Sequence, residues 1–271
     1  MLVFPNNANA AWQNNLPATP ANSAYTAVTA SATINTKGSY AELIAATTYG
    51  SYGFFLGLTN SAAAATDTSM LLDIAIGAAA SEVDILSNYL AGLKPTTPAT
   101  GGPEWTFIPL FIPAGARVSA RIQGVIASDI LQVAVSLIGG RSQVSDKIFT
   151  ACDTYGANTA DSGGTSHTPG NTGAESTPAT IGTASRDYGA VLLSLGNTLT
   201  VASNLAYHWE LVASATTLAE WLSHTTTAEN ILGPYPSQPA LVRISNGTAM
   251  QIQAECSATA EAQDVALHCF Y

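Results

Sequence analysis

Histidine and cysteine are the residue types in this chain that are best suited to holding a metal ion. A zinc site needs three or four such ligands converging on one point, and the sequence contains neither a CxxC nor an HxxxH spacing. His208 and His268 are expected on separate strands, and His268 alternates with Leu267 and Cys269, so it points away from the face that those two share. We therefore predict no metal site and interpret the histidines as exposed or hydrogen-bonded strand residues. The four histidines are His167, His208, His224 and His268.

The three cysteines are an odd number, which argues against a disulfide framework. Cys256 and Cys269 are expected near the two ends of a closing strand pair, where small buried thiols are common. Cys152 is expected in a linker. We predict that all three are free thiols.

Carboxylates that lie close together are a second source of possible chemistry. A pair of them hydrolyses a glycoside when the two flank the bond at the separation that the mechanism sets. Glu82 and Asp84, with Glu220 at a similar place later in the chain, instead have the spacing of a solvated strand or turn. Asp73 and Glu210 occupy equivalent positions of an internal repeat, where duplicated polar residues more often tie a loop. No catalytic residue is predicted.

The familiar short motifs of catalysis and cofactor binding are missing from the sequence. No Gly-x-Ser-x-Gly nucleophile elbow, phosphate-binding loop or dinucleotide fingerprint is present. Asn246-Gly247-Thr248 matches a glycosylation sequon, but Asn-Gly between two apolar strands is also a strong hairpin signal, and we favour the turn. The sequence predicts a chain that is not an enzyme and binds no cofactor.

Aromatic residues offer a possible carbohydrate platform, because sugar rings stack on exposed aromatic faces. Trp105 and Trp209 are embedded in strand patterns and are expected in the core. Tyr155 and Tyr235 are better candidates for exposure, which keeps a glycan-binding role open. The tryptophans considered are Trp12, Trp105, Trp209 and Trp221.

Composition limits the classes of partner. Charged residues make up 10% of the chain, against roughly 25% in typical soluble domains, and such a charge-poor surface suits protein partners. The net charge is −10, and ten of the acids fall in residues 149–271 beside only Arg186 and Arg243. Without a basic footprint we expect no nucleic-acid partner and no anionic membrane partner. The N-terminus has no signal-peptide pattern, so a soluble protein is expected.

A faint internal repeat carries most of the architectural information. Ile112–Ile122 is similar to Ile244–Ala254, and Val133–Leu137 is similar to Val265–Cys269, at one common offset of 132 residues (244 − 112 and 265 − 133). A shared turn and a shared alternating strand indicate that one β-module is used twice.

Turn signals recur every 8–12 residues or so, which is typical of a sandwich or jelly roll. The sequence therefore predicts an all-β fold with two tandem β-sandwich modules of jelly-roll type. In the second module, Tyr188–Leu193 is expected to match Tyr40–Ile44, His208–Ala213 to match Leu71–Ile76, and Ala219–Leu222 to match Ser81–Leu86. The predicted organisation is an extended N-terminal arm (1–38), a first module (39–140), a Gly/Thr/Ser-rich linker or long loop (141–185) and a second module (186–271).

The stretches Ala62–Gly77 and Ile112–Gly140, in a Thr-, Ala- and Ser-rich chain with few charges, resemble structural proteins of tailed bacteriophage virions. The resemblance implies a β-sandwich or jelly-roll subunit of a head, collar, tail or fibre that self-assembles without a cofactor. It carries over no functional residue, because such proteins have no catalytic motif to match.

The function expected from these observations is that of a non-enzymatic virion structural protein. Its partners would be copies of itself, for example in a trimer, and other virion proteins, met during assembly in the host cytoplasm. The arm and the linker are expected to make contacts between subunits. The alternative is a glycan- or receptor-binding module of tail-fibre or lectin type, and a sandwich-based polysaccharide depolymerase ranks last.

Overall fold

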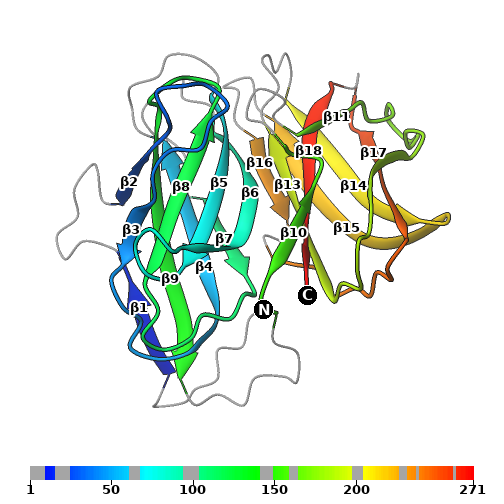
Figure 1. Cartoon of the computed structure of the whole chain (residues 1–271). Helices are drawn as coiled ribbons and strands as arrows, with labels where there is room; N and C mark the ends of the chain where they lie inside the picture. Colours follow the sequence, from blue (N-terminus) through cyan, green and yellow to red (C-terminus); the bar gives the residue numbers. More distant parts are fainter. Residues whose placement is uncertain are drawn as a thin grey trace.

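The structure is a computed structural model that contains strands and no helix within the residues it describes. All named strand pairs are antiparallel, and the strands form four sheets (Figure 1). None of the described segments is a helix long and apolar enough to cross a membrane. The all-β class predicted from the sequence is therefore confirmed. The described residues are 10–15, 25–60, 68–93, 104–140, 149–158, 164–196, 204–225, 231–235, 238–258 and 261–271.

Residues 10–140 form the first half of the molecule, which consists of two sheets. In sheet A the order is β1-β9-β4-β7, and β2 pairs with β9 beyond β1; in sheet B the order is β3-β8-β5-β6. Inward side chains of both sheets form one buried cluster that contains Phe54, Leu72 and Val135. The strands are β1 (Ala10–Asn14), β2 (Thr26–Thr29), β3 (Ala41–Ile44), β4 (Ser51–Asn60), β5 (Thr68–Ile76), β6 (Val83–Leu93), β7 (Glu104–Ile108), β8 (Val118–Gly124) and β9 (Ile130–Gly140).

Residues 149–271 form the second half, again with two sheets. Sheet C has β18 at its centre, with β10 and β11 on one side and β13 on the other, and sheet D has the order β12-β17-β14-β15-β16. Its own buried cluster contains Trp209, Trp221 and Leu267. The strands are β10 (Cys152–Tyr155), β11 (Thr165–His167), β12 (Ala179–Thr183), β13 (Ala190–Gly196), β14 (Leu205–Ala213), β15 (Thr216–Thr225), β16 (Ile231–Tyr235), β17 (Ala249–Cys256) and β18 (Gln263–Phe270).

The two halves share one scheme of strand pairing. On the central strand of sheet A, Leu137 lies opposite Phe54 of β4; on that of sheet C, Cys269 lies opposite Val191 of β13. The central strands thus differ by 132 residues (269 − 137) and their partners by 137 (191 − 54). The same two offsets relate sheet B to sheet D. The equivalent strands are β1 and β10, β2 and β11, β3 and β12, β4 and β13, β5 and β14, β6 and β15, β8 and β17, and β9 and β18.

These registers test the matches expected within the repeat. His208–Ala213 pairs as Leu71–Ile76 does, in agreement with the sequence. Tyr188–Leu193 matches the start of β4 and not Tyr40–Ile44, because Tyr188 bridges to Ile244 as Ser51 bridges to Ile112. The expected match of Ala219–Leu222 with Ser81–Leu86 is also wrong. Trp221 pairs with Trp209 as Tyr89 pairs with Leu72, so Trp221 is equivalent to Tyr89, which follows the expected range. These two matches were wrong because alternating apolar residues are common to many strands, so the hydrophobic pattern alone fits one strand to several different partners.

The expected arm and linker turn out to be equivalent elements. Within their described residues, ranges 1–38 and 141–185 hold β1 and β2, which pair with β9, and β10 and β11, which pair with β18 in the corresponding registers; residues 141–148 lie outside the described part. Range 141–185 also holds β12, the partner of β17. These strands have three to five residues, too few to show a hydrophobic period, and their hydrogen bonds come from partners far along the chain.

A common core joins the halves. The buried cluster of sheets A and B also takes in Leu192 and Phe270 of sheet C, and β6 packs against β10, β13 and β18. A second small cluster places Leu71 and Leu90 against Ala266. Strand β6 therefore makes much of the contact of the first half with the second (Figure 1).

Candidate functional site

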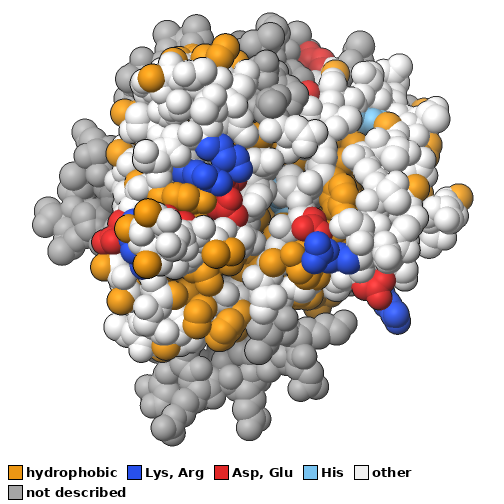
Figure 2. Space-filling model, viewed as in Figure 1, with side chains coloured by type: hydrophobic (Ala, Val, Ile, Leu, Met, Phe, Trp, Pro, Cys, Tyr) orange, Lys and Arg blue, Asp and Glu red, His pale blue; other side chains and the backbone are white. Residues whose placement is uncertain are grey.

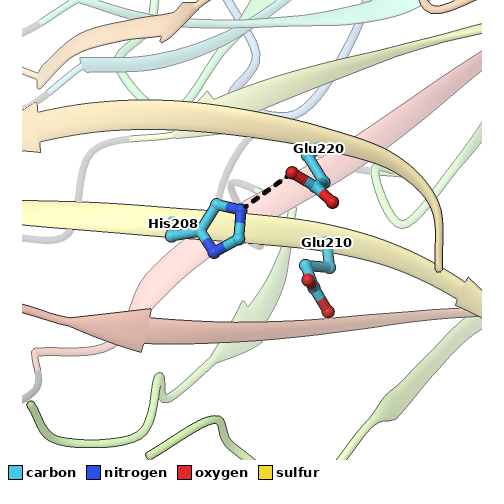
Figure 3. A group of neighbouring side chains, drawn as sticks. All are labelled: His208, Glu210 and Glu220. Carbon is cyan, nitrogen blue, oxygen red and sulfur yellow. Dashed lines mark hydrogen bonds and ion pairs between the residues drawn. The ribbon is translucent and has the colours of Figure 1, made fainter. Parts of the chain in front are cut away.

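Three side chains that can bind a metal ion meet on the outer face of sheet D. His208 and Glu210 are two residues apart on β14 and so point to the same side of the sheet. Glu220 of β15 lies directly opposite Glu210 in the pairing register. Each residue offers one ligand atom, and the three atoms lie within 4.8 Å of one another. Figure 3 shows the three side chains as neighbours, with the contact between His208 and Glu220 dashed.

The three side chains differ in exposure and in their supports. The side chain of Glu220 is 60% exposed and that of His208 is 30% exposed, with His208 Nε2 and Glu220 Oε2 3.4 Å apart. Glu210 is buried, at 8% exposure. Its Oε2 accepts a hydrogen bond of 3.3 Å from Thr217 Oγ1 and one of 2.5 Å from Gln253 Nε2. One carboxylate is thus held in place while the other two groups reach the surface.

A further acidic side chain borders this group. Gln253 Nε2 also donates to Glu175 Oε2 at 2.5 Å, so one amide links two carboxylates. Within the described residues, no lysine or arginine forms an ion pair with Glu210 or Glu220. Two carboxylates directly opposite each other on neighbouring strands repel, and His208 is the basic group beside them.

The equivalent position of the first half is neutralised by the chain itself. Asp73 of β5 corresponds to Glu210 (210 − 73 = 137), and opposite it stands Arg121 where sheet D has Gln253 (253 − 121 = 132). Arg121 Nε lies 2.8 Å from Asp73 Oδ2, and Lys37 Nζ lies 2.5 Å from the same oxygen. Asp73 is fully buried, and its Oδ1 accepts from the backbone N–H of Asn88 at 2.9 Å.

Further ion pairs continue this network over the outer face of sheet B. Arg121 also reaches Asp84 Oδ2 at 2.7 Å and stacks its guanidinium over Tyr40, 4.4 Å from the ring centroid. Burial and the hydrogen bond to Asp84 raise the pKa of Tyr40. Arg117 bridges Glu82, the other acid expected to be solvated, at 2.9 Å. Glu82 and Asp84 are therefore ion-pair partners that stabilise the first half, because the fold brings Arg117, which immediately precedes β8, and Arg121 of β8 against them.

Figure 2 shows the charged side chains of one face of the molecule as a few small groups of mixed sign, on a surface that is mostly of other types. Three of the eight lysines and arginines, Lys37, Arg117 and Arg121, belong to the network of sheet B. These three cations are thus engaged in ion pairs within the chain.

The other histidines serve structure. His268 is fully buried between the halves, where its ring stacks on Tyr89 of β6 at 4.9 Å between centroids. Its Nδ1 lies 2.9 Å from Thr154 Oγ1 and its Nε2 lies 2.7 Å from Ser194 Oγ. The interpretation of His268 as a hydrogen-bonded strand histidine agrees with this geometry. His167 Nε2 similarly meets Ser176 Oγ at 2.7 Å, and burial lowers the pKa of His167.

The three cysteines are free and buried. Cys152 lies on β10 and not in a linker, and burial raises the pKa of its thiol and that of Cys269. Of the aromatic residues, Trp209 and Trp221 lie in the core as fully buried side chains. Tyr155, expected to be exposed, is half-buried, and its hydroxyl lies 2.6 Å from that of Tyr188. The side chains of Trp12 and Tyr235 lie outside the described part.

A row of aromatic rings covers the outer face of sheet A. Phe55 and Phe107 lie 5.5 Å apart between ring centroids, and Trp105 meets Tyr25 edge to face at 6.2 Å. All four are half-buried. Trp105 and Phe107 lie across Gly57 and Gly53, where an added Cβ atom would fall 2.9 Å and 2.6 Å from the rings. Trp105, expected in the core, instead lies on this outer face.

The equivalent face of sheet C is covered within the chain. Leu192 stands where β4 has Phe55 (192 − 55 = 137), and His268 stands where β9 has Ser136 (268 − 136 = 132). Both are fully buried beside β6. The outer face of sheet C is thus buried against β6, whereas the equivalent face of sheet A has half-buried aromatic rings.

A comparison with models of known protein families finds no match, and a comparison with curated protein sequences finds none either. The sequence analysis considered His208 as a possible metal ligand and Glu210 and Glu220 as possible catalytic carboxylates, but it did not predict that the three lie together. Their proximity depends on the register of the β14–β15 hairpin, which sets Glu220 opposite Glu210.

Proposed function

We propose that this chain is a non-enzymatic structural protein of a bacteriophage virion, such as a capsid decoration, collar or tail component. It consists of two tandem β-sandwich modules of jelly-roll type and acts through self-assembly with copies of itself and with other virion proteins, in the host cytoplasm. The strand pairing common to the two halves supports the tandem arrangement of modules. A trimer of a chain with two similar modules would present six of them to its surroundings.

The outer face of sheet A is the observation that carries the assembly proposal. Its four rings, Tyr25, Phe55, Trp105 and Phe107, are half-buried, so that part of each lies at the surface, and aromatic residues are enriched in the cores of protein interfaces. The equivalent face of sheet C is already buried against β6. A second subunit that covers sheet A would bury these four rings in the same way.

Mass photometry and light scattering over nanomolar to micromolar concentrations, with electron microscopy of any particles, test the proposal. We expect closed trimers or hexamers, rings or tubes. Phe107→Glu places a charge in the aromatic face and should shift assembly to at least about tenfold higher concentration, which is a loss of about 1.4 kcal/mol per contact. Leu241→Glu, at a side chain that is 79% exposed, is the matched control and should assemble as wild type. A wild-type chain that stays monomeric at micromolar concentration overturns the proposal.

The same aromatic row favours one alternative, a glycan- or receptor-binding module. Flat rings held over glycines of a sheet suit the stacking of sugar rings. A glycan array with the wild-type chain and with Trp105→Ala separates the two functions. A monomer that binds glycans through Trp105 supports the alternative, and an assembling chain without glycan binding rules it out.

A further inference from the structure

We propose that His208, Glu210 and Glu220 bind one divalent transition-metal ion, with zinc as the probe, on the outer face of sheet D. This inference goes beyond the assembly proposal and does not depend on it. It rests on the geometry of the three donors, on the two glutamates, which form no ion pair with a lysine or arginine among the described residues, and on a comparison with the first half of the same chain.

The donor types and their separation suit such an ion. Zinc accepts imidazole nitrogen and carboxylate oxygen at about 2.0–2.2 Å, with tetrahedral angles. Two ligand atoms around one tetrahedral ion are therefore about 3.3–3.5 Å apart. His208 Nε2 and Glu220 Oε2 are 3.4 Å apart, in a long hydrogen bond or ion pair. One tetrahedral ion can bind both atoms at this separation, and the ligand atom of Glu210 lies within 4.8 Å of each.

The third donor is fixed while the others adjust. Thr217 and Gln253 hold the buried carboxylate of Glu210 by two hydrogen bonds, which is the kind of outer support that orients metal ligands. The exposed side chain of Glu220 and the half-exposed ring of His208 rotate at little cost, so they close on the ion from the surface. Positions not taken by the three side chains remain open to water, as in zinc sites with three protein ligands.

The first half shows what the repeated position requires. There, Asp73 is neutralised by Arg121 and Lys37, and Asn88 occupies the place of Glu220 (220 − 88 = 132). The second half has Gln253 at the position of Arg121 and Glu220 at the position of Asn88. Compared with sheet B, sheet D therefore has one cationic side chain fewer and one anionic side chain more at these two positions. A bound divalent cation restores the balance that Arg121 and Lys37 provide in sheet B.

The nitrogen donor sets the chemical class of the ion. Calcium and magnesium prefer oxygen ligands and rarely take imidazole, whereas zinc and its neighbours accept imidazole readily. We therefore expect zinc to bind at least about tenfold more tightly than calcium or magnesium.

Isothermal titration calorimetry of the metal-free full-length chain with Zn²⁺ tests the site. We expect one site per chain that is lost or weakened by at least about tenfold in His208→Gln and in Glu220→Gln, because each variant removes one of the three protein ligands. Both side chains lie at the surface, so the variants should fold, which circular dichroism checks. His224→Gln removes an exposed histidine from the same face of β15 and is the matched control, with affinity expected as in wild type.

Cobalt substitution gives an independent readout, because visible absorption of Co²⁺ reports the number and type of ligands. A spectrum that changes in His208→Gln and is unchanged in His224→Gln supports the proposal. Absence of saturable zinc binding by the wild-type chain overturns it, as does equal affinity in wild type, His208→Gln and Glu220→Gln. In either case His208 and Glu220 form an ion pair beside Glu210 and the three side chains bind no metal ion.

Discussion

Acidification should weaken this protein through His268, the histidine enclosed between the two halves. Its neutral ring is held by two hydroxyl groups. Thr154 donates its single hydroxyl proton to the carbonyl oxygen of Ser87, at 2.5 Å, so it accepts from Nδ1–H of His268. That leaves Nε2 of the ring to accept from Ser194. Burial lowers the pKa of His268 to about 3, because an imidazolium there would lose its hydration.

The size of the effect follows from proton linkage. In the unfolded chain the imidazole binds its proton near the ordinary pKa of 6.5, and in the folded chain it does so only near 3. Between these values the unfolded state holds more protons, so the free energy of unfolding falls as the pH falls. Each unit of difference corresponds to about 1.4 kcal/mol, so the full loss between pH 6.5 and pH 3 amounts to about 4–5 kcal/mol. Above pH 6.5 His268 contributes no pH dependence.

One carboxyl acts in the opposite direction. Burial raises the pKa of Asp264 to about 6, so the folded state takes up a proton before the unfolded state does, and stability rises as the pH falls through this range. A single pH curve of the wild-type chain would therefore understate the contribution of His268. The comparison with a variant removes this difficulty, because Asp264 is common to both chains.

Urea unfolding of wild type and His268→Gln, followed by tryptophan fluorescence, to which the buried Trp209 and Trp221 contribute, is the assay. We expect the variant to be less stable near neutral pH, by about 1–2 kcal/mol, because it lacks the stacking on Tyr89. Its loss on acidification to about pH 4 should be smaller than that of wild type by about 3 kcal/mol. His224→Gln is the control and should follow the wild-type curve, since its exposed side chain contributes no buried group. A constant difference between wild type and His268→Gln at every pH would refute the reasoning.

Two further predictions concern groups that the fold buries. Arg121→Met should lower the free energy of unfolding by about 2–4 kcal/mol, because buried Asp73 keeps only Lys37 and the Asn88 N–H. The exposed-site control Arg243→Met should change it by less than about 0.5 kcal/mol in the same urea titration, and equal effects of the two variants would contradict the role of the ion pair. The three cysteines should be unreactive toward Ellman's reagent in the folded chain and react after denaturation, because all three are buried and burial raises the pKa of the Cys152 and Cys269 thiols, which therefore form little thiolate. Rapid modification of one thiol without denaturant would contradict their burial.

Part of the candidate site was within reach of the sequence. The equivalence of Asp73 and Glu210 follows from the repeat, and the structure agrees with it through the pairings with Arg121 and Gln253. The grouping of Glu220 with His208 and Glu210 was out of reach, because it depends on the register of the hairpin between β14 and β15. A shift of one residue in that register would turn Glu220 to the other face.

The sequence by itself determined the all-β class, the internal repeat with its offset of 132 residues, and the free state of the cysteines. Those features depend on alternation, turn residues and counts, which are local and can be read in order along the chain. Only the tertiary structure decided that β1 and β2, and likewise β10 and β11, belong to the repeated scheme, and that Glu82 and Asp84 pair with arginines. Their partners lie on strands that are distant in sequence, and no local pattern records which distant strand supplies a hydrogen bond or a charge.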